Sequence, residues 1–429
     1  MLVEFSVKNF KSFKEKQTLS MVAAKKDKTL PQNLIPVDIP GLRNTNLLKS
    51  AVIYGANASG KSNLIKAFDY FVHFVLMESL EAKIGTPIKI SPFVLDDESI
   101  NEPSEFEILF IFDNVLHQYG FSITKNLVLE EWLLVSTSNK PATFFHRLYD
   151  EKLDKYEWKF SSYLKGDKVS LSENTRAKSL YLSTAAQLNH KQLSPIFEWL
   201  NKSIRVMDTM FVDFYMSFTA ELLTEEKELR NIILNLIQKA DLGIGGMECV
   251  PDFKDEKDIP IDLSTQTKLD IIEKWNKNPG LKIKMIHSSK YGNDNTFEPE
   301  DESNGTIKYF SMLGPLLDGI NSGRILFIDE FDSSIHPNLL KALIENIHHN
   351  KKVNKTGFQL IVTTHDSSLI DSHLFRRDQI WFTEKNNNGE SILYPLTDYK
   401  PRNDESLEKG YLAGRYGAIP IISANFSLE

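Results

Sequence analysis

The sequence predicts an α/β fold with a mainly parallel core sheet, an antiparallel β subdomain and a largely helical insertion. Three short apolar runs, at 51–54, 325–328 and 360–363, each end in polar residues, and helix-like stretches follow the first two. Strands that alternate with helices form a mainly parallel sheet covered on both faces. Alternating apolar residues at 104–138 indicate antiparallel strands, and a period of about 3.6 residues at 218–240 indicates an amphipathic helix.

The order of these patterns divides the chain into three parts. Residues 1–190 combine the first apolar run with the alternating segment, and residues 300–429 return to strands alternating with helices. Between them, residues 191–299 have mostly helical periodicity, so we expect one α/β body interrupted by a helical insertion or lid. The further elements expected are a hairpin at 144–160, helices at 194–202 and 264–277, and a strand at 281–287.

Composition narrows the class of protein. Apolar residues make up 41% and charged residues 25% of the chain, as in soluble globular domains. No apolar stretch approaches the roughly 20 residues that span a bilayer, and the first residues lack the pattern of a secretory signal peptide. We therefore expect a cytoplasmic protein with no membrane partner. The single cysteine, Cys249, excludes an internal disulfide and a cysteine-based zinc site.

With a net charge of −8, the molecule as a whole does not attract nucleic acid electrostatically. A local basic surface stays open, because Lys25, Lys26 and Lys28 form one short positive run. Such a run is more often a solvated loop. Function therefore has to be argued from individual sites rather than from overall charge.

A glycine-rich motif between the first apolar run and the following helix predicts a phosphate-binding loop. It satisfies the pattern G-x-x-x-x-G-K-S with Gly55-Ala56-Asn57-Ala58-Ser59-Gly60-Lys61-Ser62. The glycines let backbone N–H groups curl around a β-phosphate, and the helix that begins near Lys61 directs its positive end toward the anion. Lys61 is expected to bridge the β- and γ-phosphates, and the Ser62 hydroxyl to bind Mg²⁺. The motif therefore predicts a site for ATP with Mg²⁺.

Two carboxylates at the end of the second apolar run complete this chemistry. Asp329 directly follows residues 325–328 and is expected to hold Mg²⁺ through water. Glu330 is then placed to accept a proton from the attacking water as a general base. A core strand with a solvated acidic end is the structural alternative. The wide separation of this pair from Lys61 indicates that an arm or lid is inserted between them.

Ser303 and Gly305 precede a predicted helix. A serine hydroxyl and free N–H groups at a helix start can bind an anion, but they can also simply cap the helix. His365 follows the third apolar run, where one imidazole could lie near the γ-phosphate or serve only a structural role. Because the three apolar strands deliver their polar residues after their C-terminal ends, where ligands bind in open α/β sheets, we expect one shared site.

Taken together, these motifs resemble the AAA/ABC-like ATPases of bacterial phage defence, especially the RloA/AbiL-like group. The ATPase domains of OLD nucleases, and more distantly RecF and SMC proteins, have the same type of head. The resemblance rests on the segments at 8–13, 54–62, 303–305, 327–337, 363–366 and 411–420. It implies an ABC/SMC-type head that hydrolyses ATP at the interface of a homodimer or higher oligomer.

The resemblance also implies roles for single residues. Glu330 and His365 would act in catalysis, and Ser303 and Gly305 of one copy would reach the γ-phosphate bound by the other. Residues 332–337 resemble the segment between the two nucleotides of such a dimer, although His336 could equally cap the helix that follows. No glutamine can be assigned to the family's Q-loop. The tail at 414–417 could fold against the nucleotide or against a partner.

Three functions remain open at this point. The leading hypothesis is a sensor or regulator of a separate, nuclease-like effector in an antiphage system of the abortive-infection type. Its basis is that OLD nucleases carry a nuclease domain after the switch histidine, whereas the residues after His365 are too few for one. The second is a DNA-binding repair ATPase of the RecF or SMC kind. The third is a scaffold that binds ATP but hardly hydrolyses it.

Overall fold

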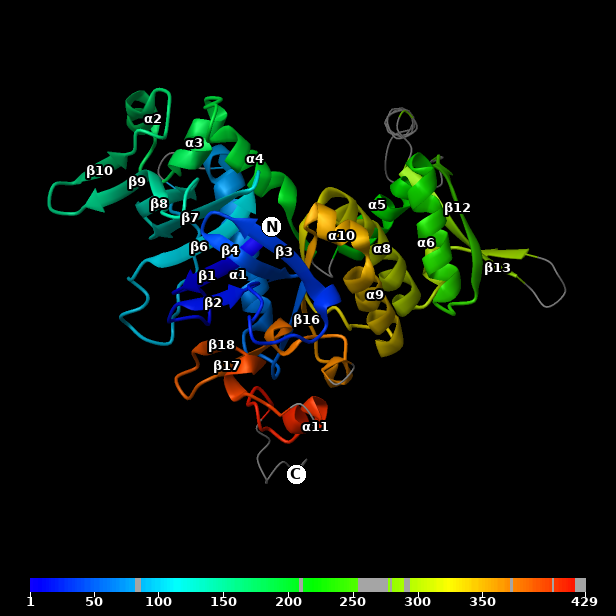
Figure 1. Cartoon of the computed structure of the whole chain (residues 1–429). Coiled ribbons are helices and arrows are strands. Elements are labelled where there is room, and N and C mark those ends of the chain that lie inside the picture. Colours follow the sequence, from blue (N-terminus) through cyan, green and yellow to red (C-terminus); the bar gives the residue numbers. More distant parts are fainter. Residues whose placement is uncertain are drawn as a thin grey trace, which may run out of the picture. The chain divides into compact units, whose positions relative to one another are not determined.

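The structure is a computed structural model that describes residues 1–81, 86–207, 211–253, 277, 280–288, 294–370, 373–402 and 405–420 (Figure 1). The chain forms two compact units. The large unit contains Met1–Met207, Gly319–Asp332 and Lys341–Glu429, and the small unit contains Asp208–Asp318 and Ser333–Leu340. Each unit is described by itself below.

The central sheet of the large unit is mainly parallel, as the sequence predicts. Its strand order is β11-β15-β16-β5-β17-β18, and every neighbouring pair is parallel except β17 and β18. The interior strands are buried on both faces, which explains their continuous apolar sequences. The strands are β5 (Ser50–Tyr54), β11 (Ile204–Met207), β15 (Ile325–Ile328), β16 (Gln359–Thr363), β17 (Ile380–Lys385) and β18 (Ser391–Pro395).

A second, antiparallel sheet confirms the predicted meander and hairpin. Its order is β10-β9-β8-β7-β6-β1-β2, so the chain runs through five consecutive strands and adds the N-terminal pair at one end. Strands β3 and β4 form a separate two-stranded sheet, which packs against this one through Val37 and Leu47. The strands are β1 (Leu2–Lys8), β2 (Gln17–Ser20), β3 (Leu34–Ile39), β4 (Leu42–Leu48), β6 (Ser104–Phe112), β7 (Val115–Ile123), β8 (Val128–Ser136), β9 (Ala142–Asp150) and β10 (Lys155–Phe160).

Helix α1 (Lys61–Glu81) is packed between the two sheets. The ring of Phe68 lies 4.0 Å from Phe5 of β1 on one side and 4.0 Å from Phe327 of β15 on the other. One turn further along, Phe71 stacks on Phe121 of β7 at 5.5 Å. Buried aromatic pairs of this kind add to the area that the helix removes from water. The start of α1, which carries the predicted phosphate loop, is therefore held by the core of the large unit.

Other helices complete both units. In the ranges that the structure describes, none is both long and apolar enough to cross a membrane. The α-helices are α2 (Lys168–Asn174), α3 (Tyr181–Gln187), α4 (Ser194–Ser203), α5 (Val212–Glu225), α6 (Lys227–Lys239), α8 (Asn304–Ser322), α9 (Pro337–His349), α10 (Lys351–Thr356) and α11 (Leu407–Leu412). The 3-10 helices are η1 (Pro31–Asn33), η4 (Pro299–Asp301), η5 (Ser367–Leu369), η6 (Arg377–Gln379) and η7 (Leu396–Tyr399).

The small unit differs from the expected helical insertion in where it starts and in how its helices are divided. It starts at Asp208 rather than 191, because β11 pairs with β15 and so keeps residues 194–207 in the large unit. The single helix expected at 218–240 is two helices, α5 and α6, separated where Glu226 adopts an extended conformation. The helix expected at 264–277 lies outside the described residues.

The small unit also contains a sheet of which only the middle strand was expected. That strand, β13 (Gly280–Ser288), pairs with β12 (Ile244–Asp252) and β14 (Asp294–Phe297), both antiparallel to it. Strand β14 is exposed along its whole length, so it has no apolar alternation that a sequence pattern could reveal. Hydrophobic periodicity therefore identifies only the partly buried middle of this sheet.

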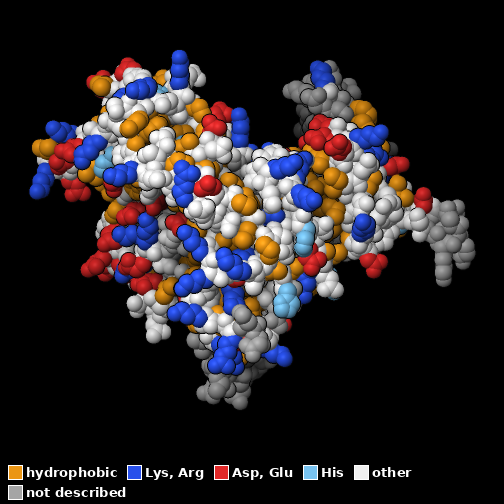
Figure 2. All heavy atoms as spheres, in the orientation of Figure 1, with side chains coloured by type: hydrophobic (Ala, Val, Ile, Leu, Met, Phe, Trp, Pro, Cys, Tyr) orange, Lys and Arg blue, Asp and Glu red, His pale blue; other side chains and the backbone are white. Residues whose placement is uncertain are grey.

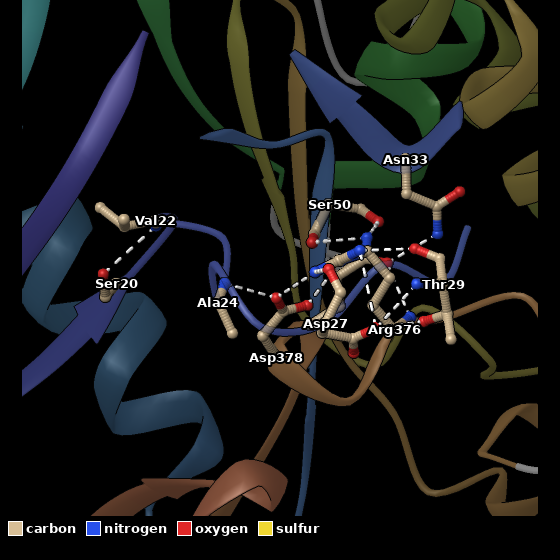
Figure 3. A network of polar contacts seen from close by, with 10 residues as sticks. Ser20, Val22, Ala24, Asp27, Thr29, Asn33, Ser50, Arg376 and Asp378 are labelled. Carbon is tan, nitrogen blue, oxygen red and sulfur yellow. Dashed lines mark hydrogen bonds and ion pairs between the residues drawn. The ribbon is translucent and has the colours of Figure 1, made fainter. Parts of the chain in front are cut away.

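A buried arginine fixes the loop that carries the basic run of the sequence. Arg376 forms a two-pronged ion pair with Asp378, at 2.9 Å from Nε and 2.7 Å from Nη2. Its guanidinium also donates to the backbone oxygens of Asp27 and Thr29, as Figure 3 shows. Asp378 in turn accepts from the backbone N–H of Ala24 at 2.7 Å. The loop backbone at 24–29 is thus tied to the residues just before β17, while its lysines stay exposed.

The surface charge is unevenly distributed. On the face drawn in Figure 2, acidic and basic side chains lie side by side toward the left edge, whereas basic side chains prevail toward the lower middle. The net charge of −8 therefore does not describe every part of the surface.

A buried histidine predicts acid sensitivity of the large unit. His348 of α9 is 2% exposed, and its Nε2 lies 2.8 Å from the Ser50 hydroxyl of β5. Burial, reinforced by repulsion from Lys49 and His349, lowers the pKa of His348 from 6.5 to about 3. The unfolded chain therefore binds a proton at a pH where the folded chain does not. This contribution to stability is complete above pH 6.5 and is lost as the pH falls toward 3.

We expect His348→Gln to flatten the loss of thermal stability that the wild type shows between pH 7.5 and 5. The wild type is expected to lose about 2 kcal/mol over this range through His348, from roughly 1.4 kcal/mol per pH unit below 6.5. His349→Gln is the matched control, because the neighbouring side chain is exposed. Tm values measured against pH should run parallel for the control and the wild type; parallel curves for all three proteins would contradict the assignment.

Candidate nucleotide site

The predicted phosphate loop connects β5 to α1 and is held from the side by β17 and β18. The Ser59 hydroxyl lies 2.7 Å from that of Thr383, and the Ser391 hydroxyl donates to the Ser59 carbonyl at 2.6 Å. Gly60 has a φ of 121°, and a Cβ atom there would collide with the Ser391 side chain. The second glycine of the motif is therefore required by both its backbone conformation and the close approach of β18.

Lys61 points into this loop. Its Nζ donates to the carbonyl oxygens of Gly55 at 2.7 Å and Ala56 at 3.1 Å, and the residue is 6% exposed. Burial lowers the pKa of Lys61, and the carboxylates of Asp329 and Glu330 counteract this shift. The lysine and the acidic pair therefore share one electrostatic environment. Ser62 is half-buried in the first turn of α1.

The acidic pair follows β15 in a turn that Thr363 of the neighbouring strand fixes. The Thr363 hydroxyl donates to Asp329 Oδ1 and accepts from the backbone N–H of Glu330 at 2.8 Å. Glu330 has a φ of 47°, a left-handed conformation that is uncommon for residues other than glycine. The Phe331 N–H donates to the Thr363 carbonyl at 2.9 Å and completes the turn. No role for Thr363 follows from the sequence, since its contacts form only when β16 pairs with β15.

His365 follows β16, which lies between β15 and β5 in the sheet. Its backbone N–H donates to Asp332 at 3.0 Å, and the preceding Thr364 N–H donates to the Ile53 carbonyl at 3.2 Å. These bonds tie the segment after β16 to both neighbouring strands. Because β15, β16 and β5 are parallel and adjacent, the acidic pair, the histidine and the phosphate loop emerge at the same edge of the sheet.

A cavity of about 570 Å³ opens at this edge. One side is formed by the phosphate loop, residues 55–59, together with His365 and Ser367. Another side is formed by the end of β17 and by the C-terminal tail, whose position the sequence left open. The lining residues of that side are Glu384, Lys385, Tyr411, Leu412, Ala418, Ile419 and Pro420.

The donor set for a cation suits Mg²⁺. The Ser62 hydroxyl and the Asp329 carboxylate are hard oxygen donors, and the orientation of Asp329 is fixed by the bond from Thr363. Magnesium in nucleotide sites uses one or two protein oxygens together with phosphate oxygens and waters. These residues fit that chemistry.

Ser303 and Gly305 lie in the small unit, at the start of α8. The Ser303 hydroxyl accepts from the Thr306 N–H at 3.1 Å, so the helix-cap alternative is realised. Gly305 approaches the Ser334 carbonyl so closely that a Cβ atom would collide with it. The His336 ring likewise accepts from the Asn338 N–H at 3.2 Å at the start of α9. Ser303 and His336 are both exposed, which leaves them accessible to a second molecule.

Comparisons with known proteins come from three sources. Residues 50–371 match the family model described as "AAA domain, putative AbiEii toxin, Type IV TA system". No curated protein matches this chain. Among solved structures, the chain is similar to the recombination mediator protein RecF in the RecFOR pathway.

The RecF similarity is distant. The RecF-ATPrS structure has 15% identity and a TM-score of 0.37, covering 92% of this chain and 98% of that one. The RecF-ATP structure has 13% identity and a TM-score of 0.33, covering 86% and 94%. The family match spans most of the chain and includes the phosphate loop, the acidic pair and His365. The chain therefore belongs to this family of AAA domains.

Proposed function

We propose that this chain binds and hydrolyses ATP at the interface of a homodimer and thereby regulates a separate effector in an antiphage, abortive-infection type system, as an RloA/AbiL-like ATPase. The observation that carries the catalytic part is the convergence of Lys61, the acidic pair and His365 at one sheet edge. The family's description as a putative toxin of a toxin–antitoxin system supports the regulatory part.

The proposed mechanism assigns one task to each side chain. Backbone N–H groups of residues 55–60 and the Lys61 ammonium bind the β- and γ-phosphates. Ser62 and Asp329 would hold Mg²⁺, which neutralises charge on the phosphate oxygens when bound. Glu330 accepts a proton from the attacking water. His365 contacts the γ-phosphate, so the segment after β16 distinguishes the nucleotide before hydrolysis from the product.

The second copy would complete the site. The Ser303 hydroxyl and the N–H groups around Gly305, at the start of α8, would bind the γ-phosphate held by the partner copy. ATP then contacts both copies only in the closed dimer, so it stabilises closure by that difference in contacts. Hydrolysis removes the γ-phosphate contact and allows the dimer to open. An effector that binds one of the two states would respond to this cycle.

Mixing two inactive variants tests the composite site. Lys61→Ala disables the phosphate loop of the copy that carries it. Ser303→Ala removes the hydroxyl that a copy would contribute to the site of its partner. A mixed dimer has one site with both defects and one intact site. Because half of randomly paired dimers are mixed, an equimolar mixture is expected to recover about a quarter of wild-type phosphate release, while each variant alone stays inactive.

Ser303→Asp provides the control for helix capping. Aspartate is as good an N-cap as serine, so Tm should be preserved. Its negative charge opposes the γ-phosphate, so phosphate release should be lost. If mixing restores no activity although the wild type hydrolyses ATP, each copy works alone and the composite site is wrong. A wild type that releases no phosphate contradicts the ATPase proposal itself.

The effector part of the proposal is tested separately, by the product of the gene adjacent to this one. A nuclease-like protein that binds this chain in a nucleotide-dependent way supports it. Recombination genes at that place favour the repair ATPase of the RecF or SMC kind instead.

A further inference from the structure

We infer that the C-terminal segment 406–420 forms the wall that binds the nucleoside part of the nucleotide, while the phosphate loop binds its phosphates. The inference rests on the proposed ATP site and adds a subsite to it. Three observations carry it: the chemistry of the cavity wall, the way the tail is fixed, and the packing that joins the tail to β5.

The two sides of the cavity differ in chemistry. The phosphate loop offers backbone N–H groups and is followed by Lys61, which suits anionic oxygens. The tail offers Leu412, Ala418, Ile419 and Pro420, which provide apolar contact but no cation. Leu412 is 61% exposed, unusually open for a large apolar side chain. The flat, uncharged ring of a nucleobase packs against such an apolar surface better than a phosphate does.

Glu384 adds to this difference in chemistry between the phosphate loop and the tail. It lies at the end of β17 and lines the cavity on the tail side. Its Oε2 accepts from the Tyr394 hydroxyl at 2.9 Å and from the Ala418 N–H at 3.3 Å. A carboxylate in this position disfavours phosphate groups on the tail side. Lys385, exposed next to it, also lines the cavity.

The tail is fixed in place by hydrogen bonds to the central sheet. The Tyr394 hydroxyl of β18 also lies 2.9 Å from the Tyr416 carbonyl oxygen, so its single proton is shared between that oxygen and Glu384. The Tyr411 hydroxyl donates to the Ala418 carbonyl at 3.2 Å and closes the tail into a compact turn. Gly417 has a φ of 67°, and a Cβ atom there would lie 2.6 Å from the Tyr394 hydroxyl. The turn therefore needs glycine at 417 so that Ala418 and Ile419 reach the cavity.

Aromatic packing connects this wall to the strand that precedes the phosphate loop. The Tyr411 ring lies 5.7 Å from Tyr54 of β5 and stacks on Phe382 of β17 at 5.4 Å. Phe382 also stacks on Tyr416 at 6.1 Å. Tyr54 directly precedes Gly55, so the wall and the phosphate loop are built on the same buried cluster. Their separation is thus set by packed side chains, as a preformed ligand site requires.

Comparing two ligands, Mg·ATP and inorganic Mg·tripolyphosphate, by isothermal titration calorimetry tests the inference. The double variant Leu412→Ala/Ile419→Ala is expected to bind ATP about tenfold more weakly than the wild type, because it removes apolar contact with the base. Binding of tripolyphosphate is expected to stay unchanged. Leu153→Ala, at a turn residue that is 56% exposed, is the matched control and should change neither ligand.

The outcomes separate this inference from the proposed function. Unchanged ATP binding in the double variant overturns the inference, because the base then lies elsewhere. An equal loss for both ligands also overturns it, because the tail then acts on the phosphate loop, for instance through the Glu408 carboxylate that accepts from Ser367 at 3.2 Å. The proposed ATP site fails only if the wild type binds neither ligand, or if Lys61→Ala binds both as the wild type does.

Discussion

Replacing Glu330 with glutamine is expected to lower steady-state phosphate release by about 10²–10⁴-fold while ATP still binds. The substitution removes the negative charge with which the side chain would accept a proton from water. Glutamine is nearly isosteric, and the bond that places residue 330 runs from its backbone N–H to Thr363. The turn after β15, including Asp329, should therefore keep its geometry.

The same variant is expected to accumulate as a closed dimer with ATP, since the contact from Ser303 of the partner copy would persist without hydrolysis. Phosphate release and light scattering with and without ATP measure the two effects. Glu345→Gln is the matched control, because Glu345 is exposed on α9, away from the acidic pair in the sequence. Turnover at the wild-type rate in Glu330→Gln would remove the general base from the mechanism.

The edge of the sheet that carries the candidate site could be predicted because its strands are buried on both faces. Strands β5, β15 and β16 therefore appear as continuous apolar runs, each with its polar residues directly after it. Parallel pairing of adjacent strands then brings Lys61, Asp329 and His365 to one edge without further information. Local sequence is sufficient to place a residue when that residue directly follows the end of a buried strand.

The cavity wall that the tail forms could not be predicted, because its position depends on contacts distant in the sequence. Nothing local to Leu412 or Ile419 indicates a ligand wall. They reach the cavity because Tyr394 and Glu384 bind the backbone of the tail. The sequence left open whether the tail at 414–417 folds against the nucleotide or against a partner.

Helix and strand assignments failed where hydrophobic periodicity and backbone conformation disagree. The apolar period continues across Glu226, since Leu222, Leu223 and Leu229 are all buried, yet the backbone is extended between α5 and α6. Periodicity reports which face of a segment is buried. It does not reveal a break in the helix when the buried faces before and after the break point in the same direction.

The antiparallel subdomain contains a buried charge that the sequence analysis did not single out, and its removal is expected to have the largest effect on stability. The side chains of Glu131 on β8 and Arg147 on β9 are both 0% exposed, with 3.8 Å between Nη1 and Oε2. Glu131 accepts from the N–H groups of Tyr181 at 2.6 Å and Leu182 at 3.0 Å, and from the Tyr119 hydroxyl at 3.0 Å. Its carboxylate thus binds the first turn of α3 to the sheet.

Glu131→Gln is expected to lower the free energy of unfolding by about 3–5 kcal/mol, because it leaves the arginine charge buried without its counter-charge. The new amide group would also face backbone N–H donors where a carboxylate oxygen now accepts from them. Glu130→Gln is the matched control. That neighbouring side chain is 38% exposed and pairs with His146, so its loss is expected to cost no more than about 1 kcal/mol.

Urea unfolding followed by circular dichroism measures both changes, and a double variant decides whether the charge of Arg147 is the cause. In Glu131→Gln/Arg147→Met the unpaired charge is gone, so the double variant should be more stable than the sum of the two single losses predicts. Arg147 is also placed over the Tyr156 ring at 3.9 Å, and methionine retains part of that packing. Equal destabilisation by Glu130→Gln and Glu131→Gln, or strictly additive losses in the double variant, would show that the buried pair does not stabilise this subdomain through its charges.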